Sequence, residues 1–412
     1  MDLFNRLFKG DRVIWVIFMA LCIVSVIEVF SAISTLAYKS GDYLGPGIRH
    51  ASFLLGGFLL ILIIHNLPCR FFSILIVLMP VSALILLYTL FFGEEINDSS
   101  RWINLFGIRF QPSEIAKLSC IVYVSFLLSR RKMYTDAQIF KYILCGVTVI
   151  CALILPENFS TAAILFLVCF LMMFIGGISL KRIGLLSVIL LLLAVSFFSL
   201  LHSLPDPMIK KYDILAKIKH RTENTFTPTP PLDAKTYDLN DYNRQESYAK
   251  IAIANGGLGK LPGHGQQRDT LPQAYADFIY AIIIEEMGII AGFFVLLLYI
   301  ILIIRVGAIA HKCDKLFPKF LVLGCGLMIG VQALANMAVV VGLFPVTGQP
   351  LPLVSRGGTS TVITCVYFGI ILSVSRFGAG MGNEDDEEDE DEEPQEIEGE
   401  KIEEEHRIED KK

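Results

Sequence analysis

The sequence predicts an all-α integral membrane protein with about ten transmembrane helices, and three observations lead to this prediction. The 412 residues are 54% hydrophobic and only 18% charged, whereas soluble domains average about 25% charged residues. The apolar residues form separate runs of roughly 17–28 residues, each long enough to cross the ~30 Å hydrocarbon core of a bilayer. Because a backbone in lipid must satisfy its own hydrogen bonds, each run is expected to be a helix.

The expected spans leave short connections and one large loop. The first run, residues 14–35, exceeds the ~7–15 apolar residues of a secretory signal, so we interpret it as a membrane helix. Residues 156–158 are expected to form a tight turn between the fifth and sixth spans, and residues 204–276 a large loop between the seventh and eighth. The predicted spans are residues 13–36, 48–66, 70–92, 113–129, 139–155, 161–178, 181–203, 277–305, 317–343 and 357–376.

Basic residues in the short connections predict the orientation of the chain. Ten spans place them all on one side, which is expected to be the cytoplasm because short cytoplasmic loops carry an excess of Lys and Arg. Both termini are then cytoplasmic. The large loop is extracytoplasmic, since long loops are largely exempt from this rule. The basic residues in question are Lys9, Arg12, Arg70, Arg130, Arg131, Lys132, Lys181, Arg182, Arg305, Lys312, Lys315, Lys319 and Arg376.

The net charge of −5 combines two oppositely charged parts of the chain. Residues 384–412 hold 18 acidic and 4 basic residues, a charge of −14, which leaves +9 on the rest. Such an acidic segment is expected to be disordered, either as a solvating tail or as a contact for a cytoplasmic partner. We therefore divide the chain into an N-terminus (1–12), a polytopic membrane domain (13–376) and an acidic cytoplasmic tail (377–412).

The nine cysteines lie in or beside apolar runs, and no Cys-x-x-Cys pair occurs. This distribution is typical of small packing residues. It favours neither a disulfide framework nor a zinc site.

Four polar segments stand out, and all are expected at or near the extracytoplasmic ends of spans. The first contains Arg101, Trp102 and the sequence Gln111-Pro-Ser-Glu-Ile-Ala-Lys117. Proline suits the first turn of a helix, and Glu114 and Lys117 are i,i+3 neighbours on one helix face. They form either an interfacial ion pair beside a Trp102 membrane anchor or part of a polar site.

The second and third segments combine turns with hydrogen-bonding groups. In the turn at residues 156–161, Ser160 is expected to cap the next helix unless the turn, with Thr161, belongs to a site. The third segment, residues 245–277, is rich in glycine and contains Lys260 and Arg268. Exposed N–H groups and positive charge suit phosphate. We expect this part of the large loop to fold against the membrane face.

Three carboxylates follow this glycine-rich stretch. Asp277 either caps the next helix or acts as a general base at the outer rim of a cavity. Glu285 and Glu286 lie about 12 Å deeper if the helix is continuous at 1.5 Å per residue. Carboxylates at that depth are costly, so they indicate a structural pairing or a polar interior. Eight residues turn a helix by about 80° and nine by about 180°, so Glu285 is the expected cavity neighbour of Asp277.

The fourth segment, residues 344–360, is rich in Pro, Gly and hydroxyl side chains and joins two spans. Ser355 and Arg356 either face an anion or belong to a rigid re-entrant turn. Together the four segments predict an outward-opening cavity lined by basic and acidic side chains. A lipid with a phosphate or diphosphate head group is its natural ligand, and these residues alone leave open whether it is transferred, flipped or sensed.

The four segments together resemble the SEDS family of shape, elongation, division and sporulation proteins, which includes FtsW, RodA and SpoVE. The resemblance covers residues 13–376 and its motifs occur in the family's order. They read RWI, QPSE with Lys117, the loop glycines, LPQAYADFIYA with the Glu pair, and PVTGQPLPLVSRGGTS. The last of these is most similar to the FtsW branch.

The resemblance implies a peptidoglycan glycosyltransferase. Such an enzyme polymerises lipid II into β-1,4 glycan strands and releases undecaprenyl diphosphate, here during septal cell-wall synthesis in the bacterial plasma membrane. The family's essential aspartate corresponds to Asp277, which would act as a base or bind a divalent cation, magnesium or manganese. No organic cofactor is implied. The candidate substrate-binding residues are Arg101, Glu114, Lys117, Thr161, Lys260, Arg268, Glu285, Ser355 and Arg356.

The family also implies partners, namely a class B penicillin-binding transpeptidase and other division proteins, and no nucleic acid. The sequence departs from the family pattern at several positions around the motifs. Tyr275 stands where His is frequent, Gly265 replaces a common Ser and Arg268 a common Lys. Glu157 replaces the Asp of a Pro-Asp turn, and Arg356 the Tyr of a Tyr-Gly-Gly sequence. None of these changes replaces Asp277.

Two other functions remain as alternatives. A lipid II flippase would also need charges in a membrane cavity, but spread more evenly across the depth of the membrane. A non-catalytic scaffold of the division machinery would find its best support in the acidic tail. The outward position of the four segments favours the enzyme.

Overall fold

The structure is a computed structural model that describes residues 8–33, 42, 44–95, 100–105, 108–203 and 244–378. The first part of the large loop, residues 204–243, lies outside the described residues. So does the acidic tail from residue 379, and the predictions made for these two segments stay predictions.

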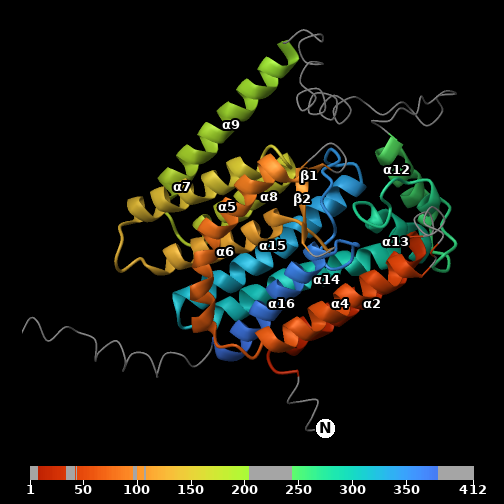
Figure 1. Ribbon diagram of the computed structural model, residues 1–412, viewed down its shortest axis with the longest axis horizontal. Coiled ribbons are helices and arrows are strands. Elements are labelled where there is room, and N and C mark those ends of the chain that lie inside the picture. The colour runs from red at the N-terminus through yellow and green to blue at the C-terminus, as the bar shows by residue number, and fades with distance from the viewer. Residues whose placement is uncertain are drawn as a thin grey trace, which may run out of the picture.

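Long helices run back and forth between two ends of one bundle (Figure 1). At one end, which we call the terminal face, α2 begins at Arg12 and α16 ends at Phe377. At the opposite end, the motif face, α2 ends at Ala32 and α16 begins at Thr359. The helices are α2 (Arg12–Ala32), α4 (Gly45–Ile64), the 3-10 helix η1 (Cys69–Val77) continued by α5 (Leu78–Phe92), α6 (Pro112–Ser129), α7 (Asp136–Ile154), α8 (Phe159–Ile175), α9 (Leu180–Ser203), α14 (Ile289–His311), α15 (Leu316–Val340) and α16 (Thr359–Phe377).

Each predicted span except residues 277–305 corresponds to one of these helices. Eight segments in the described part of the chain are long and apolar enough to cross a membrane, with η1 and α5 counted as one. The apolar α8, with 17 residues, and α9, with 24, occupy the places of the sixth and seventh predicted spans. Helices α6, α15 and α16 are the most buried and form the centre of the bundle. The nine cysteines are all free, as the sequence predicted, and seven of them are buried.

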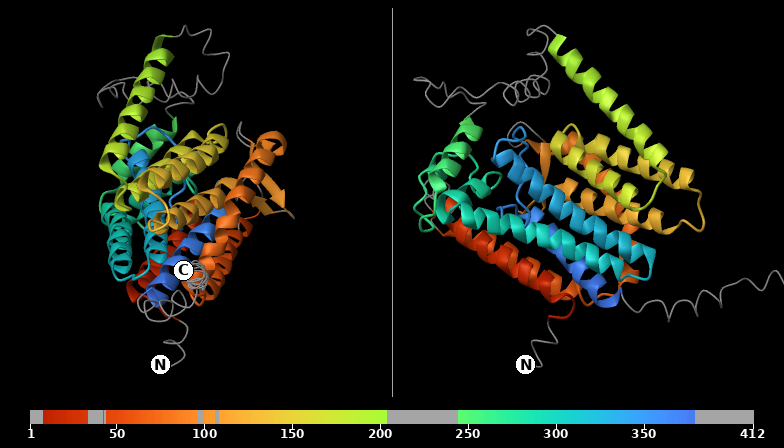
Figure 2. Two further views of the ribbon diagram at one scale, coloured as in Figure 1. Left: turned by 90° about the vertical axis from the view of Figure 1, so that its left-hand side faces the viewer. Right: turned by 180° about the vertical axis from the view of Figure 1, so that it is seen from behind.

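Helix α9 leaves the bundle at an angle, so that its last turns stand clear of the other helices (Figures 1 and 2). Six consecutive residues, 188–193, are exposed on all sides of the helix. Its base is held at the terminal face, where Arg182 forms an ion pair with Asp136 and the Ser179 N–H donates to the same carboxylate at 3.2 Å. An apolar helix that is exposed all round is suited to lipid contact.

The connection predicted as a loop at residues 93–112 contains a small antiparallel sheet instead. Its strands β1 (Glu94–Glu95), β2 (Ser100–Leu105) and β3 (Ile108–Phe110) lie in the order β1-β2-β3. In the β2–β3 pair, Ile103 lies opposite Phe110. Aromatic and β-branched residues favour strands, and they recur at short spacing here, which explains the difference from the prediction.

The single span predicted at residues 277–305 is wrong, because the structure has two helices there. Helix α13 (Ile279–Met287) ends at Gly288, and α14 begins at the next residue. Gly288 has φ 87° and ψ 169°, a conformation outside the helical region and disfavoured for other residues. The loop at residues 257–260 fills the break, since the Ile289 N–H donates to the Gly257 carbonyl at 3.3 Å and the Lys260 N–H donates to the Glu286 carbonyl.

Replacing Gly288 by alanine is expected to destabilise the protein. The new Cβ would lie 2.7 Å from the backbone nitrogen of Gly259, and the positive φ adds strain of about 1–3 kcal/mol. Gly307→Ala in α14 is the matched control, because a Cβ added there would meet no neighbouring element within 4 Å among the described residues. Thermal unfolding in detergent should show a clearly lower midpoint for Gly288→Ala and an unchanged midpoint for Gly307→Ala. Equal midpoints would contradict the account of the break.

The second half of the large loop folds against the motif face, as predicted. Helix α12 (Arg244–Gly256) is followed by a glycine-rich turn and the short 3-10 helix η2 (Gln267–Asp269). Figure 1 shows α12 and α13 together at this end of the bundle. Gly256 packs so closely on α13 that an added Cβ would lie 2.3 Å from the Ile284 carbonyl oxygen.

Candidate active site

Lys117 and Glu114 form a buried ion pair at the start of α6. Helix α6 begins at Pro112, as predicted, and the Lys117 Nζ lies 2.9 Å from Glu114 Oε1, with both side chains almost fully buried. Lys117 also donates to Gln332 Oε1 at 3.1 Å, and Gln332 Nε2 donates to the Pro350 carbonyl at 3.1 Å. The pair therefore links α6, α15 and the loop before α16. It is not the interfacial ion pair that was one of the two predicted alternatives.

Asp277 lies immediately before α13 and its side chain is partly exposed. Its backbone carbonyl accepts a 2.7 Å hydrogen bond from Asn336 Nδ2, which also donates to the Gln349 carbonyl at 2.7 Å. A Cβ added to Gly348 would lie 3.7 Å from Asp277 Oδ2, so the carboxylate faces the loop before α16. The N-cap of α13 is Phe278, so the alternative prediction of Asp277 as a helix cap is wrong.

Thr161 joins the same set of hydrogen bonds from α8. Its Oγ1 accepts from Gln349 Nε2 at 2.8 Å, and the Thr161 side chain is buried. The Asn158 side chain accepts from the Thr161 N–H at 3.1 Å and caps α8. The predicted cap, Ser160, is therefore wrong, since Asn158 comes before the first turn and reaches its free N–H groups.

The loop before α16 holds the backbone on either side of Asp277. Ser355 Oγ donates to the Ala276 carbonyl and accepts from the Leu351 N–H at 2.8 Å. The Arg356 N–H donates to the Tyr275 carbonyl at 3.0 Å. Residues 275 and 276 are thus fixed by the loop, and residue 277 by Asn336. This arrangement sets the position of the Asp277 carboxylate relative to the bundle.

Arg356 supplies a positive charge beside Tyr275, two residues before Asp277. Its guanidinium lies over the Tyr275 ring, 5.3 Å from the ring centroid, a geometry that favours cation–π attraction. Partial burial lowers the pKa of Arg356, Tyr275 opposes this shift, and the charge of Arg49 adds to it. Two basic side chains therefore influence each other on the motif face, and sequence reasoning had not identified Arg49.

Glu285 and Glu286 do not line a site, and this corrects the prediction for Glu285. Both side chains are fully buried. Glu285 accepts from the N–H groups of Gln266 and Gln267 at 3.1–3.2 Å. The prediction placed Asp277 and Glu285 along one helix, but α13 begins only at Ile279, and its last turn, which carries Glu285, lies against the glycine-rich loop.

Glu286 anchors the same loop to α2. It accepts from the N–H groups of Gly263 and Gly265 at 2.7 and 3.1 Å, and from Ser31 Oγ at 2.7–2.8 Å. A Cβ on Gly265 would lie 2.7 Å from Glu286 Oε1, so the missing side chain permits this contact. The N–H groups predicted to bind phosphate at these two glycines are thus occupied by a carboxylate of the chain itself.

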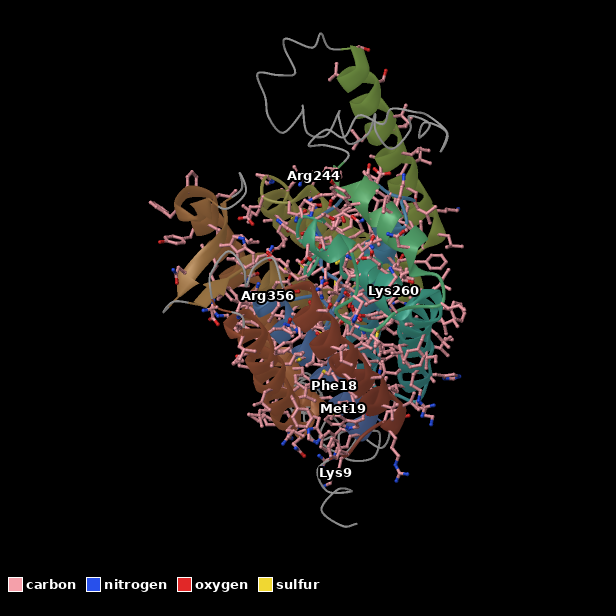
Figure 3. The ribbon with its side chains drawn as sticks, turned by 90° about the vertical axis from the view of Figure 1, so that its right-hand side faces the viewer. Lys9, Phe18, Met19, Arg244, Lys260 and Arg356 are labelled. Atoms are coloured by element: carbon pink, nitrogen blue, oxygen red, sulfur yellow. The ribbon has the colours of Figure 1, made fainter. Side chains whose placement is uncertain are left out.

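The remaining basic residues predicted for the site are spread out. Arg268 is partly exposed, and its Nη1 donates to Ser31 Oγ at 3.3 Å. Lys260 is exposed and lies well apart from Arg356 on the motif face, with Lys9 at the opposite end of the bundle (Figure 3). The side chain of Arg101 lies outside the described residues, although its backbone belongs to β2. Lys260 is therefore not part of the cluster around Asp277.

Three buried amides, Gln332, Asn336 and Gln349, were missed by sequence reasoning. They connect Lys117, the Asp277 backbone and Thr161. Gln332 and Asn336 are four residues apart in the apolar α15 and so share a helix face. That spacing of two amides inside a predicted span is the signal that would have revealed them, because buried polar groups in a membrane are expensive.

Glu286→Gln is expected to loosen the glycine-rich loop. Each hydrogen bond to a charged group contributes about 1.5–3 kcal/mol, and Glu286 accepts from Ser31, Gly263 and Gly265. Hydrogen exchange of residues 257–271, measured by mass spectrometry, should become at least about tenfold faster. Glu246→Gln, which breaks a more exposed pair with Lys250 on α12, should leave this loop unchanged. Unchanged exchange in Glu286→Gln would contradict the anchoring role.

A family model described as cell cycle protein, covering FtsW, RodA and SpoVE, matches residues 11–379. The chain belongs to the FtsW/RodA/SpoVE family. A probable peptidoglycan glycosyltransferase FtsW of Geobacter sulfurreducens is 29% identical over 378 residues, 89% of this chain and 95% of that protein. The corresponding Bacillus subtilis protein is 32% identical over 313 residues, 73% of each chain. Peptidoglycan glycosyltransferase MrdB of Escherichia coli is 28% identical over 371 residues, 88% of this chain and 93% of that protein.

Two solved structures show the same fold. One, from work on the coordination of polymerization and crosslinking by a peptidoglycan synthase complex, has a TM-score of 0.68 at 24% identity and covers 89% of this chain and 98% of that one. The rod shape determining protein RodA of Thermus thermophilus has a TM-score of 0.63 at 23% identity, covering 90% and 97%. The chain is therefore a multi-pass membrane protein of this fold.

Two hollows in the structure lie away from Asp277. An apolar groove of about 500 Å³ lies between α7, α8 and α9 and is lined by Phe159, Ala162, Ala163, Phe166, Phe170 and Leu190 among others. The other hollow, of about 460 Å³, lies at the terminal face. The outward-opening cavity predicted around Asp277 stays a prediction.

Proposed function

We propose that this protein is a peptidoglycan glycosyltransferase that polymerises lipid II into β-1,4 glycan strands and releases undecaprenyl diphosphate. The observation that carries the proposal is a set of hydrogen bonds that joins the four polar segments at the loop before α16. This loop contacts Thr161 directly, Lys117 through Gln332, and the backbone around the partly exposed Asp277, in a chain of the FtsW/RodA/SpoVE family. Curated relatives along nearly the whole chain are named as peptidoglycan glycosyltransferases. The names of these relatives are the basis for the proposed substrate. The geometry of the site is the basis for the roles proposed for its residues.

In the proposed reaction, the Asp277 carboxylate takes the proton from the 4-hydroxyl of the incoming lipid II sugar. The resulting oxygen nucleophile attacks the anomeric carbon of the growing chain. The bond to undecaprenyl diphosphate breaks, the leaving group takes the bonding electrons, and the configuration at this carbon inverts. The contacts from Asn336 and Ser355 hold the Asp277 segment in place, so they position the base.

Arg356 is the basic group best placed to stabilise the departing diphosphate, because it is partly exposed and lies beside Tyr275, two residues from Asp277. Arg268, also partly exposed, is a second candidate. Positive charge that is already in place where negative charge develops lowers the reaction barrier. Lys117 is buried against Glu114, so we assign this pair a positioning role through Gln332.

A divalent cation, magnesium or manganese, fits this set of residues in a limited way. Among the described residues no group of three or more His, Cys, Asp or Glu side chains could hold a metal ion. Magnesium, however, commonly binds one or two carboxylates together with substrate phosphates and water. Asp277 would be the protein ligand, and the cation would neutralise charge on the diphosphate.

We also infer the setting of this reaction. Basic residues such as Lys9, Arg12 and Lys312 lie at the terminal face, which supports a cytoplasmic location for both termini and an extracytoplasmic motif face. The apolar groove begins beside Thr161, at Phe159 and Ala162, and suits the isoprenoid chain of a lipid substrate. The family model is described as cell cycle protein, and one similar structure comes from work on polymerization and crosslinking by a peptidoglycan synthase complex. Both support a role at the division septum with a class B penicillin-binding transpeptidase.

The purified chain with its transpeptidase partner, lipid II and magnesium or manganese tests the proposal. Glycan products on a gel are expected only when all components are present. A parallel assay in vesicles follows the movement of fluorescent lipid II between leaflets. Polymer without leaflet exchange supports the transferase, whereas exchange without polymer would assign the flippase. Absence of both, with the partner shown to be bound, would favour a non-catalytic scaffold.

A further inference from the structure

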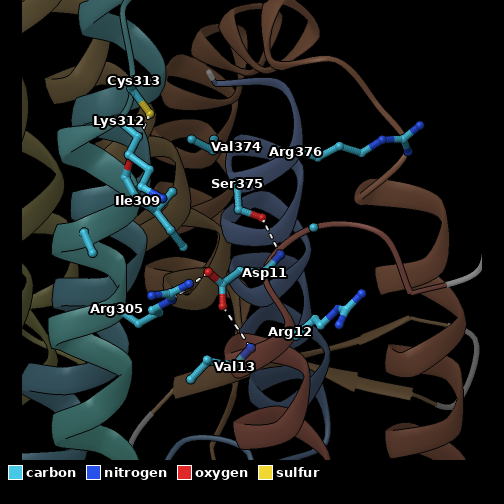
Figure 4. Close-up of a pocket in the computed structure, with 12 residues that line it drawn as sticks. Asp11, Arg12, Val13, Arg305, Ile309, Lys312, Cys313, Val374, Ser375 and Arg376 are labelled. Carbon is cyan, nitrogen blue, oxygen red and sulfur yellow. Dashed lines mark hydrogen bonds and ion pairs between the residues drawn. The ribbon is translucent and has the colours of Figure 1, made fainter. Parts of the chain in front are cut away.

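A basic pocket of about 460 Å³ lies at the terminal face, where the start of α2 meets the ends of α14 and α16 (Figure 4). This is the end of the bundle opposite Asp277, so the pocket plays no part in the proposed reaction. One acidic and four basic side chains line it, namely Asp11, Arg12, Arg305, Lys312 and Arg376. The pocket therefore has an excess of positive charge.

Asp11 balances only one of these basic groups. Its Oδ2 accepts from Arg305 Nε at 2.6 Å, while its Oδ1 accepts from the Val13 N–H at 2.9 Å and caps α2. The Asp11 N–H donates to Ser375 Oγ at 2.9 Å, which ties α2 to α16. The carboxylate is thus fully engaged at the base of the pocket and cannot neutralise a second cation.

Arg12, Lys312 and Arg376 have no carboxylate partner in the part of the chain that the structure describes. Arg376 donates to the neutral Asn66 Oδ1 at 2.6 Å. Arg12 and Lys312 are exposed at the rim, and Figure 4 shows Arg12 on one side of Asp11 and Lys312 on the other. Three uncompensated positive charges from three parts of the bundle are a binding surface for a polyanion.

A polyanion of the same chain begins next to this pocket. The described residues end at Gly378, whose carbonyl accepts from the Asp314 N–H at 3.4 Å, and a Cβ there would lie 2.8 Å from Sγ of the pocket residue Cys313. Residues 384–393 are ten consecutive acidic residues, and only residues 379–383 separate them from Gly378. Five or six extended residues reach up to about 17–21 Å, so the acidic run can return to the rim.

We propose that the acidic segment 384–393 docks into the basic pocket of its own chain. The short tether gives a local concentration in the millimolar range, which favours pairing between the acidic run and the basic pocket. Docking places carboxylates on Arg12, Lys312 and Arg376. A partner that binds the tail must first displace it from the pocket. The pocket and the partner therefore compete for this segment.

A carbodiimide crosslinking experiment on the full chain in neutral nanodiscs tests this contact, because the reagent joins an amine directly to a carboxylate. Mass spectrometry should find Lys312 joined to residues 384–393 at least about fivefold more often than Lys132, an exposed control on the same face. Raising the salt from about 0.1 M to about 1 M shortens the Debye length from ~10 to ~3 Å and should remove the difference. Arg12→Gln should reduce the Lys312 product and leave the Lys132 product unchanged.

Three results would overturn the proposal. The first is an equal yield at Lys312 and Lys132, which would show that the tail samples the whole face. The second is a Lys312 product that is insensitive to salt. The third is loss of the product when the neutral lipid is replaced by phosphatidylglycerol, which would assign the pocket to an anionic lipid head group.

Discussion

Asp277→Asn should lower the rate of glycan polymerisation by about 10²–10⁴-fold, the usual contribution of a general base. Asparagine keeps the size of the side chain but cannot accept the proton of the acceptor hydroxyl. The contacts that fix this segment use the backbone carbonyls of residues 275–277, so the substitution leaves them intact. The initial rate is measured with purified protein, its transpeptidase partner and lipid II.

The matched control for this experiment is Asp269→Asn. Asp269 is exposed in η2 and forms a long, 3.8 Å ion pair with Arg268, so the rate of this variant should stay near that of the wild type. Both variants must keep the wild-type thermal midpoint. A rate within a few-fold of the wild type for a folded Asp277→Asn would remove Asp277 from the reaction.

Lys117→Met should give the largest loss of stability, about 3–5 kcal/mol, because it leaves the Glu114 charge buried without its partner. The side chain of Lys117 is almost fully buried, so water cannot replace the lost ion pair. Gln332 would also lose its 3.1 Å donor. Thermal unfolding in detergent, with the single and double variants side by side, measures the effect.

The double variant Glu114→Gln/Lys117→Met separates a buried charge from lost packing. Removing both charges should recover most of the stability, since a buried pair is often no better than neutral groups of similar size. Lys250→Met, which breaks a more exposed pair on α12, should cost no more than about 1 kcal/mol. A double variant as unstable as Lys117→Met would contradict the assignment of the loss to the charge of Glu114.

The spans were predictable because their signal is local. An apolar run of sufficient length forms a membrane-spanning helix in a bilayer. Helices α2, α6 and α16 begin within three residues of their predicted starts. The start of α6 at Pro112 and the free cysteines follow from the same kind of local reasoning.

The break at Gly288 could not be predicted in this way. An isolated glycine in an apolar run is compatible with a continuous helix, and nothing in its neighbours indicates a positive φ. The break depends on the contact with residues 257–260, which lie about 30 positions earlier in the chain. The misplacement of Glu285 has a separate cause, because Gly288 comes after this residue. The contact between the last turn of α13 and residues 266 and 267 has no signature in the spacing from Asp277.

The candidate site was predictable in its segments but not in its contacts. The sequence indicated that the segments containing Lys117, Thr161, Asp277 and Arg356 face one end of the bundle, and the structure places them there. It did not indicate that Gln332, Asn336 and Gln349 connect them. Hydrogen bonds between distant helices have no signature in the spacing of either partner.

The most direct test of the account is a structure of folded Asp277→Asn protein with its transpeptidase partner and bound lipid II. The account predicts the 4-hydroxyl of the acceptor sugar within about 2.6–3.2 Å of the side chain at position 277. It also predicts a diphosphate beside Arg356 and an isoprenoid chain in the groove between α7, α8 and α9. A sugar bound at the terminal face, or on the motif face out of reach of residue 277, would contradict it.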